Sequence, residues 1–183
     1  MAEQPRVDPL EASAFFADGR ASRPLVPGTV ARGHLNEDRH LFTGKLDGDE
    51  GDATSHYATE FPFAVSDAVM SRGQERFTIF CVVCHGRLGD GDGKVVDRGY
   101  TRPPSLRTDK SRGYARRGED RSLADAPAGY LFDVITNGFG AMPDYAEQVP
   151  VEDRWAIIAY IRALQAADLP AAKTDEPSDG DKQ

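Results

Sequence analysis

The feature that most constrains the fold is a pentapeptide near the middle of the chain, Cys81-Val82-Val83-Cys84-His85. The chain contains 2 cysteines, and both lie in this motif. This is the spacing for covalent attachment of a c-type haem. Two thiols at this spacing near a helix end reach the two vinyl groups of one porphyrin, and the next residue places an imidazole beneath the iron. We therefore expect one covalent haem c, bound through Cys81 and Cys84, with His85 as an iron ligand.

Three other interpretations of the motif compete with haem attachment. A CxxC redox pair normally belongs to a βαβ unit, and the sequence shows no such unit. A zinc site needs two further ligands, and the other histidines (His34, His40 and His56) lie in an irregular region. The third alternative is chance. A disulfide framework is excluded, because the chain has no further cysteine.

Composition supports a bound group in the interior. Leu, Ile, Val and Phe make up about a fifth of the chain, near the limit for a self-sufficient side-chain core. A large, flat, apolar porphyrin would supply the missing core. No apolar run is long enough to span a bilayer. The formal net charge of −8 and the lack of interleaved basic and aromatic residues argue against nucleic acid as a partner.

The sequence divides into three parts. Residues 1–65 lack a sustained period and carry dispersed aromatic residues, which predicts an extended, irregular N-terminal arm. Residues 66–167 contain predicted helices at 66–81, 126–137 and 151–166 and form the expected haem domain. Residues 168–183 are polar and acidic, which predicts a flexible tail. Residues 98–121 are rich in Lys and Arg and form either a solvated loop or a docking site for an acidic protein surface.

The sixth iron ligand must come from outside the motif. Met142 lies in a Gly-rich segment between two predicted helices, where a thioether can approach the open face of the iron. Two other candidates for the sixth ligand are Met70, which lies on the helix that leads into the motif, and a histidine of the arm. The histidine is the main alternative to Met142. Soft sulfur favours ferrous iron and raises the reduction potential relative to bis-histidine ligation. An iron with both axial positions filled argues for electron transfer rather than oxygen or peroxide chemistry.

Residues around the motif resemble class I cytochrome c. Gly73 and Phe77 precede Cys81 as a glycine and an aromatic do in that family, where they meet the last helix at a crossing. Ile157 and Tyr160 fall where that helix presents its aliphatic and aromatic partners. The resemblance implies an all-α class I cytochrome c fold, with crossed N- and C-terminal helices around one haem.

The run Pro104-Ser105-Leu106 resembles the Pro-x-Leu of the same family. The resemblance implies that the Pro104 carbonyl accepts the Nδ1–H of His85, so that Nε2 binds iron, and that Leu106 packs on the ring.

A narrower resemblance extends over the arm. Its motifs look like those of the monohaem cytochrome c subunit of bacterial alternative complex III, a membrane quinol:electron-acceptor oxidoreductase. They are Asp8-Pro9-Leu10, residues 15–20, residues 23–26, residues 28–33, residues 42–45 and Phe61-Pro62-Phe63. The resemblance implies partners: the other subunits of such a complex, including a multihaem cytochrome, and a terminal oxidase or soluble carrier as acceptor. It also implies that the chain carries electrons and is not a catalyst by itself.

Two other functions stay open from the sequence. One is a freely diffusing periplasmic cytochrome that serves another dehydrogenase or oxidase. The other is a haem enzyme or gas sensor in which Met142 is a labile ligand.

Attachment of haem c happens outside the cytoplasm, but the first residues show no signal peptide. We therefore expect that a leader, with or without a lipidated cysteine, is missing from this chain. The expected location is the periplasmic face of a bacterial membrane.

Overall fold

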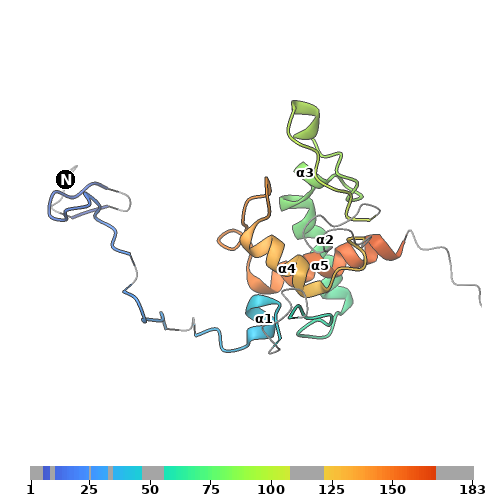
Figure 1. Cartoon of the computed structure of the whole chain (residues 1–183), viewed down its shortest axis with the longest axis horizontal. Coiled ribbons are helices and arrows are strands. Elements are labelled where there is room, and N and C mark those ends of the chain that lie inside the picture. The colour runs from blue at the N-terminus through green and yellow to red at the C-terminus, as the bar shows by residue number, and fades with distance from the viewer. Residues whose placement is uncertain are drawn as a thin grey trace, which may run out of the picture. The chain divides into compact units, whose positions relative to one another are not determined.

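The computed structural model describes residues 6–8, 11–24, 26–32, 35–46, 56–107 and 122–167. Their elements are α1 (Arg39–Thr43), α2 (Asp67–Phe80), α3 (Val82–His85), the 3-10 helix η1 (Val96–Arg98), α4 (Ala128–Asn137) and α5 (Val151–Ala166), shown in Figure 1. Extended pairing in the described parts is limited to isolated bridges. The expected all-α fold is therefore confirmed. None of the described helices is long and apolar enough to cross a membrane.

The chain divides into two compact units, residues 1–36 and residues 37–183. In the first unit, Ala12 and Arg20 form a short antiparallel bridge. Arg23 forms an ion pair of 2.7 Å with Asp18 and lies 4.2 Å from the centre of the Phe16 ring. The predicted tail (168–183) and most of the basic stretch (108–121) lie outside the described residues.

The second unit is built around the crossing of α2 and α5. Helix α2 begins where the Ser66 side chain accepts a hydrogen bond from the Val69 amide. A Cβ added at Gly73 would lie 2.0 Å from the Ala156 carbonyl oxygen, so the two backbones are in direct contact. One turn further along, the Phe77 and Tyr160 rings are 5.4 Å apart. The crossing predicted from these positions is confirmed.

Charged side chains tie the two crossing helices together beside this contact. The carboxylate of Asp153 on α5 is largely buried and accepts two hydrogen bonds from Arg72, of 2.7 and 2.9 Å. Arg76 on α2 lies 3.2 Å from the same carboxylate. One carboxylate shared by two guanidinium groups therefore adds charged contacts to the packing between the two helices.

Residues 37–46 and 56–63, which we expected to belong to an extended arm, pack on the helices of the second unit. Helix α1 is capped by Asp38, and its Leu41 carbonyl accepts a hydrogen bond of 2.8 Å from Trp155 Nε1. The Ala58 amide donates to the Gly44 carbonyl, and the Gly129 amide donates to the Ala58 carbonyl. A Cβ at Gly129 would lie 1.9 Å from the Gly44 oxygen, so glycine is required for this approach.

Candidate functional site

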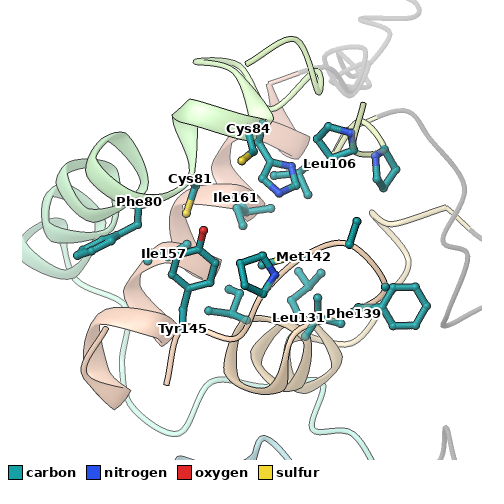
Figure 2. Close-up of a pocket in the computed structure, with 18 of the residues that line it drawn as sticks. Phe80, Cys81, Cys84, Leu106, Leu131, Phe139, Met142, Tyr145, Ile157 and Ile161 are labelled. Carbon is teal, nitrogen blue, oxygen red and sulfur yellow. The ribbon is translucent and has the colours of Figure 1, made fainter. Parts of the chain in front are cut away.

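An apolar cavity with a volume of about 240 Å³ lies among α2, α3, α4, α5 and the loops between them. Its walls are mainly aliphatic and aromatic side chains, including Phe77, Leu123, Leu131, Ile135 and Ile157. The same walls contain all six residues predicted for the cofactor site: Cys81, Cys84, His85, Pro104, Leu106 and Met142. Figure 2 shows the two cysteine sulfurs on one side of the cavity, across from Leu131 and Met142.

The two cysteines lie where α2 ends and α3 begins. Cys81 is the junction residue between the two helices, and the amides of Cys84 and His85 both donate to its carbonyl, at 3.1 and 2.8 Å. The two cysteines do not form a disulfide with each other. Burial raises the pKa of the Cys81 thiol to about 12. A redox-active CxxC pair normally has a lowered thiol pKa, which burial of Cys81 does not provide.

His85 ends α3, and Gly86, with a φ of 75°, turns the chain away from the helix. Burial lowers the pKa of His85 to about 4, so the imidazole is neutral at neutral pH, as an iron ligand must be. Its Nδ1 is buried and has no hydrogen-bond partner among the described residues. The hydrogen bond to the Pro104 carbonyl is therefore not formed in this structure, although Pro104 lines the same cavity. The orienting role of Pro104 stays a prediction.

The segment that carries Leu106 is fixed from two directions. The Leu106 amide donates 2.8 Å to the Gly89 carbonyl, and the Leu106 carbonyl accepts 2.7 Å from Gln165 Nε2 on α5. Leu106 itself is buried. A Cβ at Gly91 would lie 2.3 Å from the Pro103 oxygen, so the Gly-rich loop after the motif packs tightly on this segment.

Met142 lies on a short loop that starts and ends on the last turn of α4. The Gly138 amide donates to Val134, and the Tyr145 amide donates to Ile135. Between them, Phe139 and Met142 exchange two backbone hydrogen bonds, both of 3.0 Å. A Cβ at Gly138 would lie 2.6 Å from the Met142 oxygen, so this turn requires glycine. The loop therefore presents Met142 at the cavity wall.

The rival sixth ligands lie elsewhere. Met70, on α2, is not part of the cavity wall. His40 Nε2 lies 2.9 Å from the Glu60 carbonyl oxygen, and its ring packs edge-on against Trp155. His56 also lies outside the lining, and His34 lies outside the described residues. His85 is therefore the one described histidine in the wall.

Several lining residues were not predicted from the sequence. Tyr100 donates a hydrogen bond of 2.6 Å to the Ala141 carbonyl, and Tyr145 faces the cavity near the cysteines. Burial raises the pKa of the Tyr145 hydroxyl. Neither tyrosine has a spacing signal in the sequence, because each reaches the cavity from an irregular segment. Their positions depend on how the loops fold.

The donor set fits a covalently attached haem. Two thiols, a buried neutral imidazole and a thioether meet in one apolar cavity. The described residues contain no cluster of three or more His, Cys, Asp or Glu that could hold a bare metal ion. A zinc site at Cys81 and Cys84 is therefore not supported by further protein ligands.

Comparisons with solved structures find weak likenesses. The chain is similar to a reducing HAO-like protein complex of Kuenenia stuttgartiensis (20% identity, TM-score 0.44, 60% of this chain and 49% of that chain covered). It is similar to cytochrome cL from Hyphomicrobium denitrificans (24% identity, TM-score 0.37, 51% of this chain and 46% of that chain covered). Cytochrome cL from Methylophaga aminisulfidivorans is also similar (23% identity, TM-score 0.42, 67% of this chain and 71% of that chain covered). The chain spans about half the length of the first two. No curated protein matches it.

A family model gives the decisive comparison. The model described as cytochrome c oxidase, cbb3-type, subunit III matches residues 68–161. The match covers more than half of the chain and includes both the Cys-Val-Val-Cys-His motif and Met142. The chain therefore belongs to this family and is a helical c-type cytochrome with covalently bound haem c.

Proposed function

We propose that this cytochrome carries single electrons as a subunit of a membrane quinol-oxidising respiratory complex. The observation that carries the electron-transfer part is the composition of the cavity wall. Among its described residues, the wall offers one histidine and one methionine as axial ligands, and its other polar side chains are Tyr100, Thr101, Arg102, Tyr130 and Tyr145. Oxygen or peroxide chemistry depends on polar distal groups and an open iron position. Because His85 and Met142 together would leave no open iron position, this pair favours a carrier over an enzyme or gas sensor.

In this proposal Cys81 and Cys84 would hold the haem through thioethers, and His85 and Met142 would bind its iron. Bound haem supplies a reversible one-electron couple. The protein surrounds it with apolar side chains, which exclude water and favour the less charged ferrous state. Leu106 packs on the ring, and Pro104 orients His85. The thioether sulfur of Met142 raises the reduction potential further.

The proposed place in a larger complex rests on the N-terminal unit. Exposed apolar side chains are frequent there: Val7, Phe15, Val26 and Val30 are each more than half exposed. Phe15, at 87% exposure, lies beside residues held in place by the Arg23–Asp18 ion pair. In the proposed complex these exposed apolar side chains would be buried against a neighbouring subunit. The proposed partners are the other subunits of the complex, among them a multihaem cytochrome that donates electrons. A terminal oxidase or a soluble carrier would then accept them.

The proposed location is the periplasmic face of the bacterial membrane, because haem c is attached outside the cytoplasm. The alternative is a freely diffusing periplasmic cytochrome that serves another dehydrogenase or oxidase. The haem site would be the same in both.

Purification from the native membrane separates these two functions. We expect the cytochrome to elute in gel filtration with a multihaem cytochrome, and quinol to reduce it within that complex. A variant lacking residues 1–36 should keep its haem spectrum but elute alone. If the full chain also elutes only as a monomer, and quinol does not reduce it in the presence of the complex, the diffusing carrier is the correct function.

A further inference from the structure

The loop that carries Met142 is fixed at its base and little supported at its tip. The base is held by the hydrogen bonds of Gly138 and Tyr145 to the end of α4. At the tip, Phe139 and Ala141 are exposed, and Gly140 has a φ of 60° with no atom near its missing Cβ. These three residues line the cavity, and few other side chains of the protein contact this end of the loop.

A hydrogen bond from a distant segment reaches this tip. The Tyr100 hydroxyl donates 2.6 Å to the carbonyl of Ala141, the residue directly before Met142. The two residues are 41 positions apart in the sequence, and both line the cavity. Among the described residues, this is the side-chain hydrogen bond that links the tip to another part of the chain.

Tyr100 is itself tied to the haem-attachment motif. The Val95 amide donates 3.1 Å to the carbonyl of Val83, which lies between the two cysteines. The Tyr100 amide then donates 3.0 Å to the Val95 carbonyl. Gly99, with a φ of 93°, makes the turn that brings Tyr100 back toward Val95. Three hydrogen bonds thus connect the segment that holds His85 with the segment that holds Met142.

We propose that Tyr100 is a positioning residue that holds the Met142 loop against the cavity and so keeps the thioether sulfur on the iron. The proposal rests on the proposed function, in which Met142 is the sixth ligand. Tyr100 does not touch the iron in this account. It acts through its hydrogen bond to the Ala141 carbonyl, which makes the conformation in which the loop has moved away from the cavity less favourable. Without its hydroxyl, the ligand should leave the iron more often.

Tyr100→Phe tests this in the holoprotein, because it removes the hydroxyl and keeps the ring. The readout is the affinity of ferric iron for added imidazole, which binds only after Met142 leaves. Loss of one exposed hydrogen bond should raise that affinity roughly three- to tenfold. Hydrogen exchange should also speed up at the Met142 amide. The ultraviolet circular dichroism and the midpoint of unfolding of the ferrous protein should change little.

Tyr160→Phe is the matched control. Tyr160 lies at the crossing of α2 and α5, outside the cavity wall, and its hydroxyl has no hydrogen bond among the described residues. Its imidazole affinity should equal that of the unaltered protein. The proposal is overturned if Tyr100→Phe also binds imidazole with unaltered affinity, or if both variants change equally.

The two claims fail differently. If Met142→Ala leaves the ferric spectrum unchanged, the assignment of Met142 is wrong, and the role of Tyr100 is overturned with it. If Met142→Ala opens the iron but Tyr100→Phe has no effect, Met142 stays the ligand and only the role of Tyr100 is rejected.

Discussion

His85 and Met142 are held by different amounts of structure. The His85 amide donates to Cys81, its carbonyl accepts from Gly91, and two thioethers would flank it. Met142 relies on a turn of four residues and on the Tyr100 bond. If His85 and Met142 bind the iron as proposed, the iron should lose its sulfur ligand more easily than its nitrogen ligand. Substitution of Met142 should leave the haem attached, because attachment depends on Cys81 and Cys84.

Met142→Ala is the direct test at this scale. We expect the haem to stay bound, the ferric iron to bind cyanide or imidazole readily, and the potential to fall on the order of 0.1 V, a part of the roughly 0.8 V that axial ligands span. Met70→Ala is the control, because Met70 lies on α2 outside the cavity wall. Visible spectroscopy and a redox titration measure both variants. An unchanged ferric spectrum for Met142→Ala would remove Met142 from the site.

At the scale of elements, the crossing of α2 and α5 determines where the haem-attachment motif lies relative to α5. Gly73 lies on α2 two turns before Cys81, and α5 contributes Ile157 and Ile161 to the cavity wall. If the two backbones separated, α5 would move away from the cysteines. The contact at Gly73 therefore connects the packing of two helices to the shape of the haem cavity.

Gly73→Ala should destabilise the holoprotein by about 1–3 kcal/mol, because the new methyl group would overlap the Ala156 carbonyl. Denaturation by urea, followed through the circular dichroism of the helices, measures the difference. Gln74→Ala, at the next and exposed position, should stay within about 0.5 kcal/mol of the unaltered protein. Equal midpoints for the two variants would show that the crossing tolerates a side chain at Gly73.

At the scale of the whole molecule, the sequence predicts what is local and misses what depends on distant contacts. The haem motif and the three longer helices follow from spacing, caps and apolar periodicity within short windows. Helix α4 begins one residue after Pro127, close to the predicted start. Residues 37–63 carry no period in the sequence, and the packing of the described ones (37–46 and 56–63) depends on Trp155 and on the approach of Gly44 to Gly129. No local rule reveals such a pairing.

A pair of truncations tests whether residues 37–65 are part of the folded domain. Both start from the export-competent holoprotein, one retaining residues 37–183 and the other residues 66–183. The shorter chain should be less stable by about 3 kcal/mol or more, because Trp155 loses the Leu41 carbonyl and its edge contacts with His40 and Phe61. Thermal unfolding of the ferrous forms measures this. Coincident melting curves would instead make residues 37–65 a dispensable covering.

The measurement that tests the whole account most directly is the pyridine haemochrome spectrum of the denatured protein, produced with an export signal in a host that attaches haem c. The account predicts the spectrum of a haem with both vinyl groups saturated, one per chain, that stays with the polypeptide after acid–acetone extraction. A spectrum of free vinyl haem, loss of all colour on extraction, or an intact mass equal to that of the bare polypeptide would contradict it.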